Sequence, residues 1–131
     1  MGLSKVWVRT STDGLVRADH IIGLSSHQTP SLPGKPVHWL VDVTLGVSVG
    51  SGGTTGWDVN ALHRTLIQTR TEPVGATEAL AELLARLSDA DPAGIIITRM
   101  VEAAPNQRVE FTFQPFTAAT ATTSSEDHTE P

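Results

Sequence analysis

Apolar residues alternate strictly with other residues over positions 39–49 of the chain. Successive side chains of a strand point to opposite faces, so this run predicts a strand with one buried face. Most of the residues in between are polar or small, Asp42 and Thr44 among them, although Leu40 is there as well. One-sided alternation is typical of an antiparallel sheet whose second face meets water or a partner. The apolar positions are Trp39, Val41, Val43, Leu45, Val47 and Val49.

Two further strands are predicted before this one. Residues 5–10 alternate, and the pair Asp13-Gly14 that follows is a hairpin signal. Residues 27–36 contain three prolines and are predicted to be a loop, because proline cannot donate to a sheet ladder. Residues 15–24 would form the second strand, and we expect one of its faces to carry Val16, Ala18, His20, Ile22 and Leu24.

Residues 61–69 fit either a strand or a helix that Asp58 would cap. The β-branched residues Thr65, Ile67 and Thr69 favour the strand. The glycine-rich segment before it would then close a long hairpin with the strand at 39–49. Pairing about the centre of that loop would place Asp42 opposite Arg64, a favourable cross-strand pair.

Residues 76–87 are predicted to form an amphipathic helix, because four leucines follow helical spacing. After it, Gly94–Ala103 contains three consecutive isoleucines and favours a strand. A helix beginning at Asp91-Pro92 remains an alternative for this segment. Residues 108–113 alternate again and predict a last strand. The four leucines of the helix are Leu80, Leu83, Leu84 and Leu87.

These elements predict an α+β fold of β-β-β-β-α-β-β order, with a curled antiparallel sheet of about six strands and one amphipathic helix. A helix about 18 Å long cannot cover a sheet about 29 Å across. We therefore expect the sheet to curl into a barrel-like roll or to pack against another copy. Residues 1–116 would form a single domain, and the small, polar and finally acidic residues 117–131 are predicted to be a disordered tail.

Composition excludes several kinds of chemistry. The 131 residues include no cysteine, which excludes disulfides, cysteine-bound metals and a thiol nucleophile. The net charge of -5 and the scattered basic residues make nucleic acid an unlikely partner. No signal-like or membrane-spanning apolar run is present, so we expect no membrane partner and a cytoplasmic location. The excess of Arg over Lys indicates a GC-rich bacterium or phage.

The glycine-rich segment after residue 46 does not fit a phosphate-binding loop. A dinucleotide fingerprint that starts at Gly50 would need glycine at position 55, which is Thr55. Asp58 would also repel a phosphate. Residues 46–50 match a Gly-x-Ser-x-Gly pattern, but they lie inside the alternating run rather than at a strand-to-helix turn. We interpret the segment as a hairpin end in which glycines allow positive φ.

Histidines are the remaining candidates for chemistry. His20 with His38 or His63 could meet across strands and, with Asp19 or Asp42, hold a ligand or a metal. None of them forms a spaced pair typical of a metal site, and ordinary hydrogen-bonded histidines are the simpler interpretation. We therefore predict no cofactor and no bound metal.

The sequence thus favours a non-enzymatic protein–protein interaction or structural module that self-associates. Trp7, Leu40 and Trp57 are the candidate interaction surface, because they are large apolar residues at predicted strand faces or a loop tip. The partner would be another protein or a second copy. The alternative is a small barrel-like ligand-binding protein or enzyme for a small molecule, whose site would lie near His20, His38, Asp42 and His63.

Overall fold

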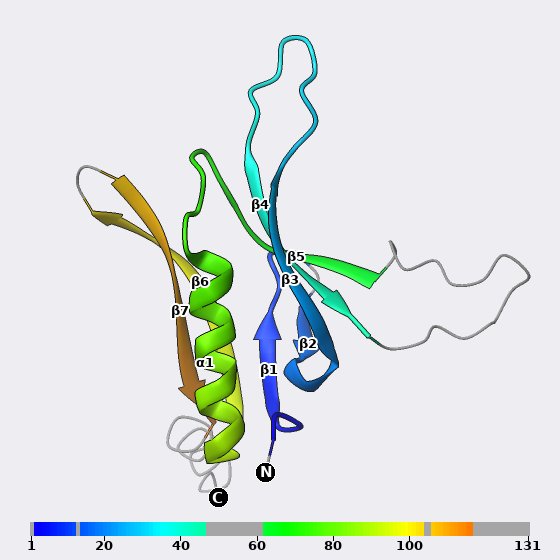
Figure 1. Cartoon of the computed structure of the whole chain (residues 1–131), viewed down its shortest axis with the longest axis vertical. Helices are drawn as coiled ribbons and strands as arrows, with labels where there is room; N and C mark the ends of the chain where they lie inside the picture. The colour runs from blue at the N-terminus through cyan, green and yellow to red at the C-terminus, as the bar shows by residue number, and fades with distance from the viewer. Residues whose placement is uncertain (1, 13, 47–61, 104–105, 117–131) are drawn as a thin grey trace, which may run out of the picture.

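The computed structural model describes residues 2–12, 14–46, 62–103 and 106–116. Seven strands and one α-helix lie within these residues (Figure 1). Val47, Val49, Trp57, the glycine-rich segment and the acidic tail lie outside the described residues. The elements are β1 (Val6–Arg9), β2 (Leu15–Arg17), the 3₁₀ turn η1 (Ala18–His20), β3 (Ile21–Gln28), β4 (Trp39–Leu45), β5 (His63–Thr69), α1 (Ala76–Ala90), β6 (Gly94–Ala103) and β7 (Asn106–Pro115).

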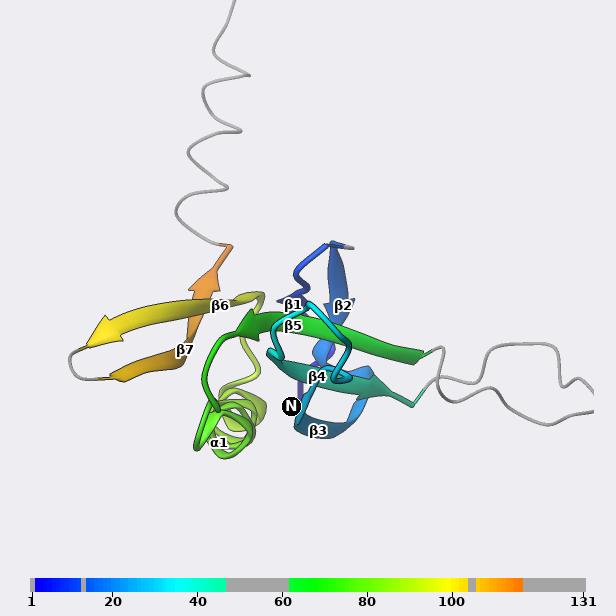
Figure 2. The same cartoon turned by 90° about the horizontal axis from the view of Figure 1, so that it is seen from above.

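The strands form two sheets, so the prediction of one curled sheet is wrong (Figure 2). A four-stranded sheet has the order β2-β1-β6-β7, and a three-stranded sheet has the order β3-β4-β5. The three-stranded sheet is antiparallel. The four-stranded sheet is mixed, because β1 pairs with β6 in parallel. The α+β class and the order of the predicted elements are confirmed, apart from one strand that is divided in two.

The divided strand is the one predicted over residues 15–24. The turn η1 follows β2 directly and sends the chain into the second sheet as β3. The alternation of buried and exposed side chains ends at this turn, since Ala18 is 2% exposed whereas Ile22 is 72% exposed. Ile22 is also the extra residue of a β-bulge, because Ile21 pairs with Leu45 and Gly23 with Thr44. The expectation that these residues share one face is therefore wrong.

Both segments that fitted either a strand or a helix are strands. β5 pairs with β4 in the predicted hairpin, and β6 pairs with β7 over its whole length. The hairpin register differs from the predicted one by one residue. Asp42 lies opposite Thr65, and Arg64 lies opposite Val43. The same register holds from Thr44–His63 to Asp42–Thr65, and a bulge beyond Asp42 then brings Val41 opposite Ile67.

The helix and the three-stranded sheet cover the same face of the four-stranded sheet. Leu80 of α1 is fully buried there together with Val8 and Ile96. Val43 and Leu66 of the three-stranded sheet join the same core. The second sheet thus covers the area that one helix leaves open, and no curling is needed. The opposite, outer face of the four-stranded sheet has no described helix or strand over it (Figure 2).

The helix α1 ends at Ala90, three residues beyond the predicted end at Leu87. Asp91 adopts a left-handed conformation with φ 54, and its N–H donates to the carbonyl of Leu87 at 2.9 Å. This bond satisfies one of the last carbonyls of the helix. Pro92 follows, so the chain leaves the helix and enters β6, which brings the isoleucines of β6 beside β1.

Candidate functional site

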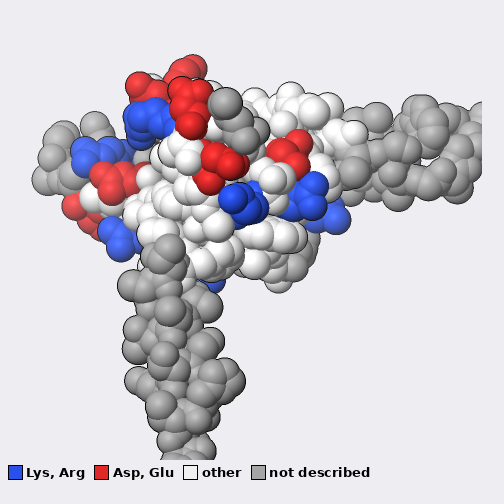
Figure 3. Space-filling model, turned by 90° about the horizontal axis from the view of Figure 1, so that it is seen from below, with Lys and Arg blue, Asp and Glu red and all other residues white. Residues whose placement is uncertain are grey.

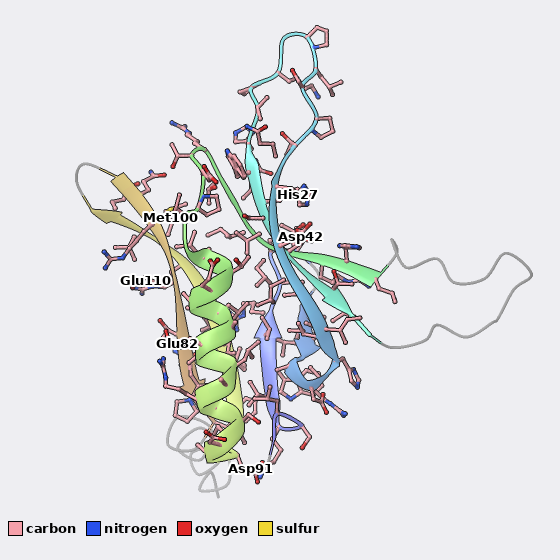
Figure 4. All side chains as sticks on the ribbon, viewed as in Figure 1. His27, Asp42, Glu82, Asp91, Met100 and Glu110 are labelled. Atoms are coloured by element: carbon pink, nitrogen blue, oxygen red, sulfur yellow. The ribbon has the colours of Figure 1, made fainter. Side chains whose placement is uncertain are left out.

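A polar cluster lies on the outer face of the three-stranded sheet, and Asp42 of β4 is at its centre (Figure 4). His27 Nε2 lies 2.6 Å from Asp42 Oδ2. Thr65 Oγ1 donates to Asp42 Oδ1 at 2.8 Å. The Asp42 side chain is 7% exposed, whereas the His27 side chain is 50% exposed. A nearly buried carboxylate is therefore held from both neighbouring strands.

The contacts of His27 indicate its protonation state. Its Nδ1 faces the carbonyl oxygen of Gln28 at 3.3 Å. Carboxylate and carbonyl oxygens only accept hydrogen bonds, so the ring satisfies both contacts when both nitrogens carry a proton. The hydrogen bond to Asp42 accordingly raises the pKa of His27, although partial burial opposes the rise.

This arrangement suits an ion pair better than proton transfer. A general base needs a free lone pair within reach of the substrate proton. Both ring nitrogens of His27 already face an acceptor oxygen, so neither is free to take a proton from a substrate. The cluster of His27, Asp42 and Thr65 balances a buried charge and ties β3, β4 and β5 together.

The predicted histidine site is assembled only in part. His63 pairs with Thr44, whereas His38 precedes β4 at the other end of the same ladder. Five steps along a strand separate those ends by about 17 Å. His20 lies in η1, where Arg17 Nη2 is 3.3 Å from its Nε2. Of the four residues predicted for a site, Asp42 alone belongs to the cluster on this face, and its partner is His27.

Sequence reasoning missed His27 as the partner of Asp42. Its position beside three prolines predicted a loop, whereas β3 extends to Gln28. The signal that was available is the spacing along a hairpin. With β3 and β4 joined by the proline-containing loop, His27 pairs with Leu40 and comes diagonally next to Asp42.

Trp7 and Leu40 do not share one surface. Val6 and Val8 of β1 are fully buried, so Trp7 between them points to the outer face of the four-stranded sheet. Leu40 alternates with the buried Val41 and lies on the outer face of the other sheet. These faces point away from each other, because the core lies between the sheets. Trp57, the third predicted contact, lies outside the described residues.

The outer face of the four-stranded sheet has an apolar centre. Trp7 pairs with Ile95, and Ile97 lies two residues further along β6. All three side chains are partly exposed, whereas Ile96 on the inner face is fully buried. Leu15 at the edge of the same face is 44% exposed. The apolar centre consists of Trp7, Ile95 and Ile97.

Charged residues surround this apolar centre in pairs. Arg17 donates to Asp19 at 2.8 Å, and Arg108 donates to Glu110 at 2.8 Å. The end of the molecule drawn in Figure 3 shows the same mixture, with positive and negative side chains next to each other. A continuous basic stripe, which nucleic-acid binding needs, is not seen among the described residues on that side.

Two other findings concern metals and membranes. No three His, Asp or Glu side chains in the described ranges come together as a possible metal site. The helix that the structure describes is too short and too polar to cross a membrane.

Comparison with known proteins gives no relative. The chain matches no protein-family model, no curated protein sequence and no solved structure.

Proposed function

We propose that this chain is a non-enzymatic protein-interaction module that self-associates through the outer face of its four-stranded sheet. The observation that carries this proposal is the apolar centre of Trp7, Ile95 and Ile97, over which no described element lies. Apolar area of this kind at the middle of a sheet is typical of a contact surface. A second copy would cover it.

The surroundings of the apolar centre suit a symmetric contact. In a two-fold dimer each surface meets itself, so a single-signed rim would repel its partner. Here both signs are present, because Arg99 lies opposite Glu110 across β6 and β7. A rotated copy can therefore bring opposite charges together at the rim.

The size of the face limits the strength of such a dimer. Four strands span about 19 Å, which gives a contact at the low end of stable protein interfaces. We expect a reversible dimer with a dissociation constant of about 1–100 µM. Assembly should therefore depend on protein concentration.

Native mass spectrometry over a range of concentrations tests the proposal. We expect the wild-type chain of 13.9 kDa to form a dimer with no additional mass. Trp7→Glu should leave a folded monomer, because it places a charge at the centre of the contact. Leu40→Glu is the matched control on the other sheet and should still dimerise. A monomer at every concentration, or a dimer that survives Trp7→Glu, would overturn the proposal.

A further inference from the structure

A groove runs between β3 and α1, on the side of the four-stranded sheet away from Trp7. Its volume is about 470 Å³. Glu78 is the one charged residue among the described residues that line it. Thr77 adds one hydroxyl, and the remaining walls are apolar, with Ile21, Ile22 and Leu24 from β3 and Ala81 and Leu84 from α1.

The strand that borders this groove has an unpaired edge. Among the strands that the structure describes, β3 pairs with β4 on one side and with none on the other. Thr29 N–H donates to the carbonyl of His38 at 2.7 Å. Antiparallel pairs alternate between those that exchange hydrogen bonds and those that do not. Thr29 belongs to a hydrogen-bonded pair, so every second residue before it does as well. Leu24 and Ser26 belong to the pairs in between, and their N–H and C=O groups point away from β4.

A second groove beside the helix is lined by more charged residues. It lies between α1 and the edge strand β7, and its volume is about 410 Å³. Glu82 and Arg86 line it from the helix, and Arg108 and Glu110 line it from the strand (Figure 4). Pro115 closes one end of β7. Charges and proline are features that keep an edge strand from pairing with another chain.

The edge of β3 lacks that protection over residues 21–26, which include neither a charged residue nor a proline. Ile22 is instead exposed at the bulge, where it borders the groove. A free strand edge beside an apolar groove is the arrangement in which a peptide adds a strand and seats alternate side chains.

The charge of Glu78 indicates which kind of segment can bind in the groove between β3 and α1. Glu78 at the groove favours an incoming Lys or Arg. Residues 117–131 of this chain contain Glu126, Asp127 and Glu130 and no Lys or Arg, so their negative charge would be repelled by Glu78. β3 of a second copy also has no Lys or Arg to offer. The groove therefore suits a basic segment of a different protein.

We propose that β3 and α1 bind an extended peptide segment of another protein. The segment adds a strand beside Leu24 and Ser26, places an apolar side chain between Ile22 and Leu84, and pairs a Lys or Arg with Glu78. This site does not depend on the dimer proposed above, because it lies on the opposite side of the four-stranded sheet.

Selection from a displayed library of random peptides on the full chain tests this proposal. We expect enriched peptides to carry apolar residues at alternate positions and a Lys or Arg. When the most enriched peptide is synthesised and added, amide exchange at Leu24 and Ser26 should slow about tenfold or more. A selection that enriches no peptide, or a peptide that leaves these two amides unprotected, would overturn the proposal.

Two substitutions sharpen the result. Ser26→Pro removes an outward N–H that the fold does not use, so it should abolish peptide binding while the circular dichroism spectrum is retained. Glu78→Lys should change the selected peptides from basic to acidic, whereas Glu82→Lys, which faces the other groove, should not. Selection of the same basic peptides by Glu78→Lys would contradict the charge assignment and with it the proposed partner.

The unliganded chain distinguishes the other occupants. We expect fast exchange at Leu24 and Ser26 at all concentrations without peptide. Protection that rises with protein concentration would show that a second copy pairs with β3. Protection that is present even at high dilution would show that a segment of the same chain does so. Either outcome contradicts a site for a foreign peptide, and neither bears on the dimer through Trp7.

Discussion

The outer faces of the two sheets differ in what they leave unsatisfied. On the three-stranded sheet, the buried carboxylate of Asp42 receives hydrogen bonds from His27 and Thr65. On the four-stranded sheet, Trp7 and Ile95 lie side by side and partly exposed, with no described element above them. On the first face the buried polar group has hydrogen-bond partners. On the second face apolar area remains exposed that a partner could bury.

The contrast shows why polar character alone does not mark a functional site. An Asp and a His at 2.6 Å resemble part of a catalytic arrangement. Both ring nitrogens of His27 already face acceptor oxygens, and the contact with Asp42 links β3 to β4. The face with few polar groups at its centre is the one through which we propose self-association.

The largest effect is expected from Ile95→Glu on the four-stranded sheet. It places two like charges near the two-fold axis and removes apolar area from both copies, so the dissociation constant should rise about 100-fold. Sedimentation equilibrium measures this change. Leu40→Glu on the three-stranded sheet provides the comparison, and an equal effect from both substitutions would show that the faces do not differ.

A smaller effect on folding is expected from His27→Ala on the three-stranded sheet. It leaves the carboxylate of Asp42 nearly buried with only Thr65 as a partner, which should cost about 2 kcal/mol of unfolding free energy at neutral pH. Adding Asp42→Asn should recover part of this loss, because a neutral amide costs less to bury. Urea denaturation measures both variants. No recovery in the double variant would contradict the assignment of the cost to the buried charge.

Thr65→Val should cost about 1 kcal/mol, because it removes one hydrogen bond to the carboxylate and keeps the β-branched shape. Thr112→Val on the four-stranded sheet is the matched control. Thr112 is exposed on β7, and its replacement should change the free energy of unfolding by less than about 0.5 kcal/mol. Equal costs in the two variants would argue against a special role for Thr65.

The smallest effect is a pH dependence of stability. The pKa of His27 is raised in the folded protein, so its contribution is complete below the unfolded value of about 6.5. It is lost as pH rises through the folded pKa. Half of the ring is exposed, so we expect a loss of less than about 1 kcal/mol between about pH 6 and pH 9. The wild type should unfold at a higher urea concentration than His27→Gln, and this difference between the midpoints should become smaller as pH rises over this range. A difference that does not change with pH would exclude the ion pair.

Local patterns in the sequence predicted most of the elements. The alternation around Val41 and Val43 gave the third predicted strand, and the four leucines gave α1 at its observed start. Side-chain periodicity reports burial within one element, which is why these predictions succeeded. It carries no information about which strands become neighbours. The parallel pairing of β1 with β6 joins segments far apart in the chain and was not predictable from either pattern.

The errors have local physical causes that the patterns hide. The turn η1 uses ordinary residues, Asp19 among them, and no glycine or proline marks it. The hairpin does not pair about the exact centre of its connecting segment, so Thr65 rather than Arg64 lies opposite Asp42. The prolines after Gln28 concealed the end of β3, and with it the role of His27. The contact between His27 and Asp42 was therefore not predicted, although Asp42 itself was identified as a site residue.

The most direct test of the proposed function is hydroxyl-radical footprinting of the tryptophans at low and at high protein concentration. Trp39 on β4 is partly exposed and lies away from the proposed contact, so it serves as the reference within the same molecule. If the outer face of the four-stranded sheet is covered by a second copy, oxidation of Trp7 should slow as concentration rises while oxidation of Trp39 stays constant. Oxidation of Trp7 at one unchanged rate across the whole concentration range would contradict self-association through this face.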